Sequence, residues 1–294
     1  MLARLLITAA LAQAPVSSAP YARSHVDAGD LNSPVLYWTA TSVRWNPSAA
    51  GNPVNAGDSE FAAMRRSFAS WNEVLGACGN FSLVEGDALA RRDVGYREDP
   101  NENVNLVLFR TESCSGRVPT SAACRADNSC GNVYDCWDYD ARTIGLTTTT
   151  YDVKTGIVYD SDIELNAASF EFTTADGAAC GADAIRQDCV GYDVENTLTH
   201  EVGHLVGLDH TTAQGSTMNP RAPAGETSKR TIDPGSRAFI CEVYPKGGAS
   251  VGSFIPQPPP TGSQGGCAAA GGAGLALALL GPALRLLSLR RRRS

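Results

Sequence analysis

Three histidines and a glutamate in one short stretch could hold a metal ion and use it. The sequence from His200 to His210 reads H-E-x-x-H-x-x-G-x-x-H. On a helix, side chains four residues apart lie on one face, about 5–6 Å apart at Cβ, so His200 and His204 can present ring nitrogens to one ion. Gly207 tolerates the left-handed conformation that ends a helix, which lets the chain turn and bring His210 to the same ion. Three imidazoles with an open fourth position are typical of a catalytic zinc site rather than a structural one.

Glu201 is the general base in this interpretation. Zinc lowers the pKa of a water in its open position to about 7, and the carboxylate beside the first ligand can reach this zinc-bound water without binding the metal. It can then pass the proton to the leaving amine, so the predicted reaction is hydrolysis of a peptide bond in a protein or peptide substrate. A chance H-E-x-x-H on an ordinary helix is the alternative, but at average residue usage the five fixed positions coincide in only about one in 10⁵ chains of this length.

These motifs resemble the metzincin metallopeptidases, and among them most of all the matrixins. The resemblance implies that the three histidines are the zinc ligands and that Glu201 is the base. Met218, in the sequence STMNP, matches the methionine of the Met-turn that lies beneath the ligands in this family. Thr211 is of the small, hydroxylated type that follows the third histidine in matrixins, and Pro220 stands where astacins and serralysins carry a tyrosine.

Two other functions stay open, a peptidase of another metzincin family and a surface adhesin that contains zinc without catalysis. The departure from the matrixin pattern at residues 112–142 supports the first. Glu201 argues against the second, because a purely structural zinc has no use for a base. The structural zinc of matrixins takes three histidines and an aspartate, yet His25 is the one histidine outside the motif. We therefore expect a single, catalytic zinc ion.

The hydrophobic pattern predicts an α+β peptidase domain over residues 23–245. Large apolar residues recur at helical spacing between Asp58 and Gly76, which predicts an amphipathic helix, and a second helix that begins at Asp193 carries the histidine motif. Strands are predicted at 35–45, 81–86, 103–109, 143–150 and 157–166. The resemblance implies a metzincin-like twisted mixed sheet of about five strands with these helices, and a small C-terminal subdomain after the third histidine. In matrixins the strand at the place of 143–150 is a sheet edge with which the substrate pairs.

Three acidic residues in the last of these strands could hold calcium. The alternation from Tyr159 to Leu165 puts Asp160, Asp162 and Glu164 on one face. Carboxylate oxygens are the ligands that calcium prefers. A merely solvated acidic face is an equally good interpretation of this pattern.

The cysteines predict a disulfide framework. Eight of the nine precede the C-terminal tail, and no C-x-x-C pair points to a metal site instead. An even number in a secreted chain favours four bridges, but the sequence alone leaves the pairing open. Four of these cysteines fall in the polar segment 112–142, which we interpret as a disulfide-stapled insertion beside the active-site cleft.

The two ends of the chain predict export. Residues 1–22 have a basic start, a short apolar run and small residues, as a secretory signal peptide does. Residues 246–266 form a Pro/Gly-rich linker. Residues 267–294 contain an apolar stretch of spanning length and then an arginine cluster, Arg290 to Arg293, which predicts a transmembrane segment with that cluster in the cytoplasm.

This tail resembles the myxobacterial C-terminal sorting signal, in which a Gly-Cys pair precedes a span and an arginine cluster. The resemblance implies that a sorting peptidase acts at Cys267, and that the protein reaches the cell surface or the medium after transient anchoring in the membrane. Without Arg4 and the arginines of the tail, 18 basic residues stand against 31 acidic ones. This charge balance argues against nucleic acid as a partner.

Overall fold

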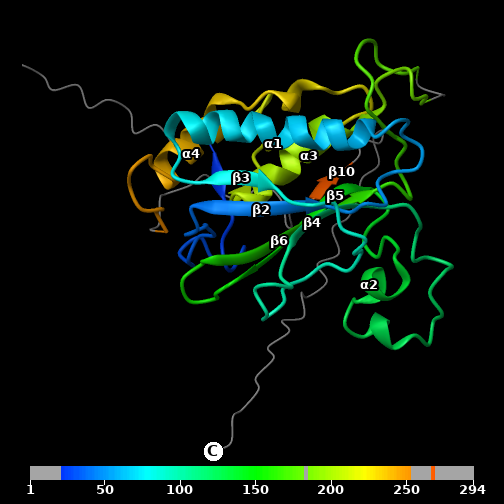
Figure 1. The fold of residues 1–294 in the computed structure, drawn as a ribbon, viewed down its shortest axis with the longest axis horizontal. Helices are drawn as coiled ribbons and strands as arrows, with labels where there is room; N and C mark the ends of the chain where they lie inside the picture. Colours follow the sequence, from blue (N-terminus) through cyan, green and yellow to red (C-terminus); the bar gives the residue numbers. More distant parts are fainter. Residues whose placement is uncertain (1–20, 182–184, 253–265, 269–294) are drawn as a thin grey trace, which may run out of the picture.

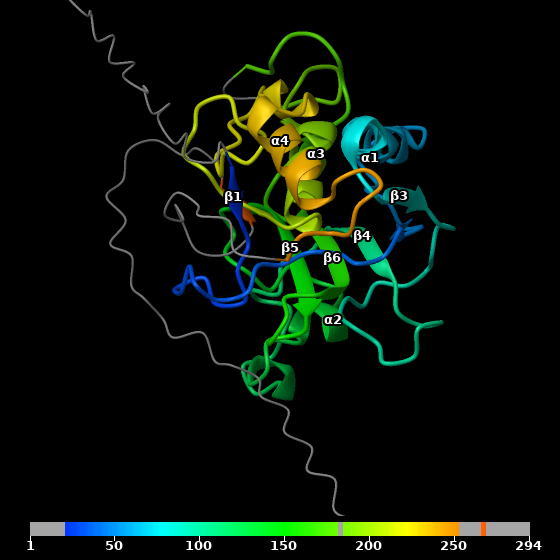
Figure 2. The same ribbon diagram turned by 90° about the vertical axis from the view of Figure 1, so that its left-hand side faces the viewer.

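The computed structural model describes residues 21–181, 185–252 and 266–268. Figures 1 and 2 show a mixed sheet with three helices on one side of it, while a loop-rich segment extends away from these helices. The helices are α1 (Ser59–Cys78), α3 (Val194–Leu205) and α4 (Pro234–Val243), and the loop-rich segment contains α2 (Cys130–Tyr134) and the short 3-10 turn η1 (Ala123–Arg125). A further 3-10 turn, η2 (Ser228–Arg230), precedes α4. The expected α+β class is confirmed.

The central sheet has the strand order β3-β2-β4-β6-β5. These strands are β2 (Ser42–Pro47), β3 (Ser82–Glu85), β4 (Asn105–Arg110), β5 (Thr143–Tyr151) and β6 (Val158–Asn166). Neighbours pair in parallel except β5, which runs antiparallel to β6. The prediction of a mixed five-stranded sheet is thus confirmed, and a sixth strand, β10 (Gly266–Ala268), pairs with the outer edge of β5. Strand β2 starts later than predicted, because Val35 and Tyr37 make only isolated bridges.

Two pairs of short strands lie beside this core. Strand β1 (Ala22–Arg23) pairs with β9 (Leu208–Asp209), directly after the active-site helix. Strand β7 (Phe172–Thr173) pairs with β8 (Tyr192–Asp193), directly before it. Both ends of α3 are therefore held by strand pairing.

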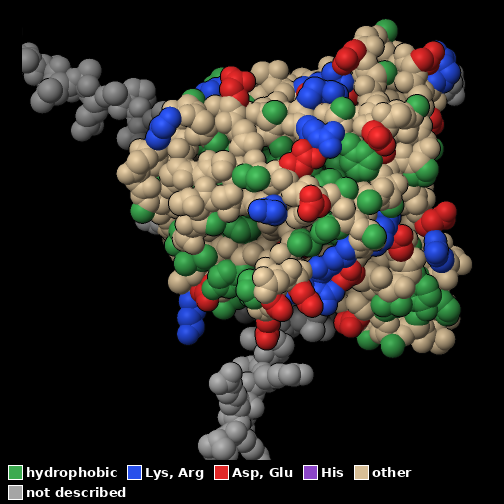
Figure 3. All heavy atoms as spheres, viewed as in Figure 1, with side chains coloured by type: hydrophobic (Ala, Val, Ile, Leu, Met, Phe, Trp, Pro, Cys, Tyr) green, Lys and Arg blue, Asp and Glu red, His purple; other side chains and the backbone are tan. Residues whose placement is uncertain are grey.

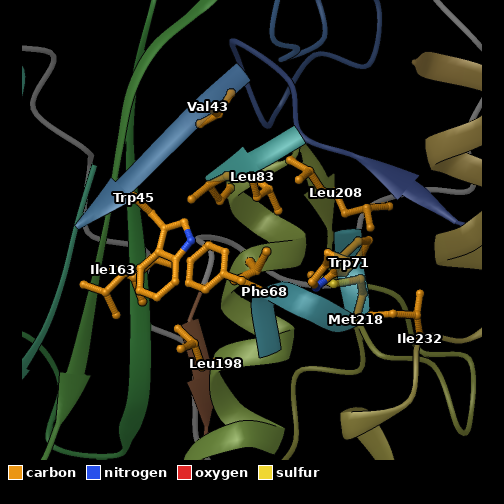
Figure 4. Packing of buried hydrophobic residues seen from close by; sticks show 14 of the residues in the cluster. Val43, Trp45, Phe68, Trp71, Leu83, Ile163, Leu198, Leu208, Met218 and Ile232 are labelled. Carbon is orange, nitrogen blue, oxygen red and sulfur yellow. The ribbon is translucent and has the colours of Figure 1, made fainter. Parts of the chain in front are cut away.

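The predicted amphipathic helix is α1, and its apolar face packs on the sheet and on α3. Trp45 of β2 stacks on Phe68 with ring centroids 3.9 Å apart, as Figure 4 shows. The helix continues past Gly76 to Cys78, where a disulfide joins it to Cys241 on α4. The helix thus ends two residues later than the predicted end at Gly76, and the disulfide holds this end against α4.

Aromatic side chains fix the position of α3 through its backbone. The indole of Trp71 donates to the carbonyl of Thr199, and that of Trp38 donates to the carbonyl of Leu205. The hydroxyl of Tyr244 donates to the carbonyl of Val206. The last carbonyls of a helix have no partner within it, so Trp38 and Tyr244 satisfy groups at the end of α3 that would otherwise be buried unpaired. Trp71 adds a second contact at Thr199, in the middle of the helix. These contacts also hold the helix in one position against the core.

The insertion at 112–142 is stapled as expected. Cys114 is bonded to Cys136, and Cys124 to Cys130; outside the insertion, Cys180 is bonded to Cys189. The prediction of four bridges among the eight cysteines that precede the tail is confirmed.

A buried ion pair anchors the insertion to the sheet. The guanidinium of Arg110, at the end of β4, is fully buried and donates to Glu164 at 2.6 Å. It also donates to Asp135 of the insertion at 2.9 Å, and Arg92 holds the same carboxylate. Burial raises the pKa of Glu164, and the charge of Arg110 works against this rise.

Replacing Arg110 by alanine should lower the free energy of unfolding by about 3–5 kcal/mol, because Glu164 would remain in the interior without its partner. Denaturant titration would measure the loss. The control is Arg142→Ala in the same insertion. The side chain of Arg142 is 75% exposed, and that of its partner Asp140 is 52% exposed. That change should leave the free energy of unfolding almost unchanged, because an exposed ion pair contributes little to stability. Equally small losses for both variants would contradict the role of Arg110.

Residues just outside the predicted domain range of 23–245 contact the domain at both ends. Tyr21 and Ala22, assigned from the sequence to the end of the signal peptide, are buried, and the Tyr21 hydroxyl donates to Glu242 at 2.6 Å. The domain also continues past residue 245, because Lys246 and Val251 are hydrogen-bonded to Cys78 and Val243. The rest of the predicted signal peptide and most of the linker lie outside the described residues.

The tail differs too. Cys267 and Ala268, the predicted start of the membrane segment, lie in β10, because an extended backbone can pair with the open edge of β5. The remainder of that segment, from residue 269 on, lies outside the described residues. Among the helices of residues 21–181 and 185–252, none has the length and hydropathy needed to cross a bilayer.

Figure 3 shows basic and acidic side chains interspersed on the face that carries α1.

Candidate metal centre and active site

The three histidines of the motif converge. His200 and His204 lie on α3, and His210 follows β9 after the turn at Gly207, whose φ is +104°. The Nε2 atoms of His200 and His210 are 3.1 Å apart, and that of His204 lies 3.2 Å from each. All three side chains are buried. In the part of the chain that the structure describes, this is the one group of three histidine, cysteine or acidic side chains close enough to share a metal ion.

The backbone sets the orientation of two of the rings. Nδ1 of His200 faces the carbonyl of Thr217 at 2.7 Å, and Nδ1 of His204 faces the carbonyl of Leu208 at 2.9 Å. A carbonyl oxygen only accepts, so each Nδ1 carries the proton and each Nε2 keeps a lone pair toward the common centre. Such a contact on the far nitrogen is typical of metal-binding histidines.

Burial keeps these rings neutral. It lowers the pKa of His204 to about 4. Burial, with the charge of His204, lowers the pKa of His210 to about 2, and the pKa of His200 falls well below its usual range for the same reasons. Neutral imidazole is the form that binds metal.

The triad fits a zinc ion. Zinc–nitrogen bonds of about 2.0–2.1 Å in a tetrahedral arrangement place ligand nitrogens about 3.3–3.4 Å apart. The observed separations of 3.1 to 3.2 Å between Nε2 atoms are close to this value. Three nitrogens also leave a fourth position, as in catalytic zinc sites.

The side chain of Glu201 extends from α3 toward strand β5. The hydroxyl of Thr147 donates to its Oε2 at 2.7 Å. Gly145 lies against the other oxygen, because a Cβ added at Gly145 would come within 2.7 Å of Oε1. Neither contact could be predicted from the sequence, since both residues are far from Glu201 along the chain. Thr147 and Gly145 are therefore positioning residues for the carboxylate.

Met218 packs against α3, the helix that carries His200 and His204. A Cβ at Gly203, the residue before His204, would overlap the sulfur of Met218, and it would lie 3.2 Å from Trp71. Figure 4 shows Met218 and Trp71 among the buried apolar side chains. The amide of Thr217, next to Met218, donates to Asp233 at the start of α4. The amide of Thr211 donates to the carbonyl of Met218 at 3.0 Å, so the turn also holds the segment that follows His210.

A cavity of about 370 Å³ borders the metal centre. It runs along β5 from Leu146 to Tyr151 and reaches His204. Tyr139 of the insertion lines it, which agrees with the expectation that the insertion lies beside the cleft. His25 and Asp209 line it as well, and neither was expected there. Their placement depends on the pairing of β1 with β9, which has no local sequence signal.

The three acidic residues expected to hold calcium are not equivalent. Glu164 is the partner of Arg110, whereas Asp162 accepts from the amides of Leu106 and Gly95. Asp160 is fully buried, and its polar neighbours are Asn103 and Asp162. Burial raises the pKa of Asp160 to about 6 and also raises that of Asp162, with the charge of Asp160 adding to the effect. Of the three carboxylates, Glu164 is thus the one already neutralised by a basic side chain.

A protein-family model matches part of the chain. Residues 135–245 match the family model described as Matrixin. This range contains β5, β6, α3, the three histidines and Met218. No curated protein matches the chain. The family match and the buried histidine triad together support a matrixin-like domain of the metzincin type with a zinc-binding site, and hence a zinc metallopeptidase, which is a hydrolase.

Proposed function

We propose that this chain is a zinc-dependent endopeptidase. The observation that carries the proposal is the position of Glu201. Glu201 lies on α3, the helix that presents two of the three converging histidines. Its carboxylate accepts a hydrogen bond from Thr147 of β5. A purely structural zinc site needs no carboxylate held in this way beside its ligands.

The edge of β5 supports an extended polypeptide as substrate. A peptide can add a strand to such an edge, and its main-chain hydrogen bonds then depend little on its sequence. The cavity follows the same strand, with Leu146, Thr148 and Tyr151 on its wall. Substrate side chains would enter this space while the backbone pairs with β5.

The residues of the chain divide the chemistry among themselves. His200, His204 and His210 would hold the zinc ion, which when bound supplies a Lewis acid that makes a water molecule more acidic and polarises the substrate carbonyl. Glu201 would accept the proton of the attacking water and donate it to the nitrogen of the leaving amine. Thr147 would keep Oε2 of Glu201 in place through its hydroxyl.

Cleavage of an unfolded protein tests the proposal. The purified chain, with one equivalent of zinc, should cut reduced and alkylated casein at internal bonds, and mass spectrometry of early products would locate them. Internal fragments before any trimming of the ends are expected from an open-ended cleft. Zinc bound at one equivalent with no cleavage would favour the non-catalytic adhesin instead.

We also propose that Asp160 and Asp162 hold a calcium ion. Saturating calcium, with zinc held constant, should raise Tm by about 5–10 °C, because a ligand at 100 times its Kd adds about 2.7 kcal/mol to the stability of a domain of this size. Calorimetry would show the shift. Asp160→Asn should abolish it, whereas Asp188→Asn, at a side chain that is 73% exposed, should keep it. A calcium shift that survives Asp160→Asn would place the ion elsewhere.

We further propose that the chain works outside the cell or at its surface, after transient anchoring by residues 267–294. The four disulfides support export, because such bridges persist in oxidising compartments. If a sorting peptidase acts at Cys267, the mature chain should end near this residue, and Cys267→Ala should leave the tail attached. Mass spectrometry of the C-terminus in fractionated cells would decide. A wild-type chain that still ends at Ser294 would make the segment an ordinary anchor.

A further inference from the structure

The strand β10 occupies one end of the β5 edge. Its register pairs Gly266 with Leu146, Cys267 with Gly145 and Ala268 with Thr143, in antiparallel direction. In Figure 1, β10 lies beside β5 and near α3, although it is far from both in the sequence. The tail of the chain thus contributes a strand next to the metal centre.

This position coincides with that of the proposed substrate. Gly145, the partner of Cys267, is the residue whose Cα lies against the carboxylate of Glu201. Leu146, the partner of Gly266, is also the first residue of β5 on the cavity wall. The pairing of β10 therefore ends where the cavity begins, so β10 overlaps only one end of the proposed substrate position, the end beside Glu201. A peptide extended along the whole of β5 past Glu201 could not pair with Thr143 to Leu146 while β10 is in place.

We propose that residues 266–268 act as an intramolecular inhibitor, which pairs with the β5 edge and excludes substrates while the tail is attached. This inference rests on the proposed peptidase function. A three-residue strand makes a weak pairing, but the chain between Gly252 and Gly266 is short and rich in proline, glycine and serine. A short tether of this kind gives an effective concentration on the order of millimolar, which is enough to favour a weak contact. The tail also covers a sheet edge that would otherwise be open to other chains.

Cutting the tether tests the proposal on the full-length chain in mild detergent. A recognition sequence for a site-specific protease is inserted within residues 253–265, and the protein is compared before and after the cut. Hydrogen exchange at the amides of residues 143–146 should speed up after the cut. For a quenched peptide substrate, the apparent KM should fall roughly 10-fold with kcat unchanged, because a tethered competitor affects binding and not turnover.

A proline in β10 gives a second route to the same result. Gly266→Pro removes an amide donor from the strand and should lower the apparent KM of the uncut chain. Ser263→Pro, the same change outside β10, is the control and should leave the apparent KM high. Both variants introduce a proline near the end of the tether, but only Gly266→Pro lies in the strand that pairs with β5.

The outcomes separate the inference from the function on which it rests. Faster exchange after the cut, without peptide hydrolysis in either state, would support the docking of β10 and overturn the peptidase function. Unchanged exchange and unchanged KM would overturn the inference, whatever the activity. Glu201-dependent cleavage of the intact chain within residues 266–268 would also overturn it, because a segment that is itself cut cannot keep the cleft closed.

Discussion

Glu201→Gln should lower kcat/KM by at least about 10³-fold and leave the zinc content at one equivalent per chain. The amide keeps the shape of the side chain and can still accept a hydrogen bond from Thr147, but it cannot take up a proton from water. General acid–base catalysis is worth about 10²–10⁴-fold, and this residue is proposed for both proton transfers. The hydrolysis of a quenched peptide and the metal content of the same sample would be measured together.

The control for this variant is Glu73→Gln, on the exposed side of α1. It makes the same chemical change away from the cleft and should leave both quantities as they are in the wild type. A Glu201→Gln protein that keeps wild-type turnover would contradict the assignment of the base. A protein that loses its zinc as well would mean that the carboxylate helps to hold the metal, contrary to its role as a base alone.

The metal site could be predicted because its geometry is local. His200, Glu201 and His204 lie within one helical turn, so their spacing alone fixes which face each occupies. Gly207 with its positive φ then accounts for the return of His210. Disulfide formation could also be predicted from cysteine number and compartment, but the bridge between Cys78 and Cys241 needs α1 and α4 side by side, which no short stretch encodes.

Residues that act across the sheet could not be predicted in the same way. Thr147 and Gly145 reach Glu201 only because α3 packs over β5. The alternation in β6 correctly placed Glu164 on the face of Asp160 and Asp162, yet it could not show that the neighbouring strand supplies Arg110 as its partner. Strand β10 had a composition that resembled the start of a membrane segment, and only the open edge of β5 makes it a strand. In each case the partner comes from a distant part of the chain, so pairing and packing decide the outcome.

Loss of one ligand should abolish both zinc binding and activity. His204→Ala leaves only two of the three ligand nitrogens. Removing a residue that merely hydrogen-bonds to a metal ligand lowers metal affinity by about 10–100-fold, so removing a ligand itself should lower the affinity for zinc by more. Activity should fall to the background of the assay, because the ion acts as the Lewis acid of the reaction. Metal analysis after dialysis against buffer with a trace of zinc, together with peptide hydrolysis, would measure the two effects.

His25 provides a matched control for His204. It is the remaining histidine of the chain, and like His204 it is buried and lines the cavity. However, it lies outside the triad, and its Nδ1 faces the carbonyl of Ser33 at 2.9 Å. His25→Ala should therefore retain one equivalent of zinc, whatever its effect on substrate binding. If His204→Ala also kept a full equivalent, the triad would not be the zinc site. If His25→Ala lost the metal, the site would extend beyond the motif to the segment that follows β1. Strand β1 pairs with β9, directly before His210.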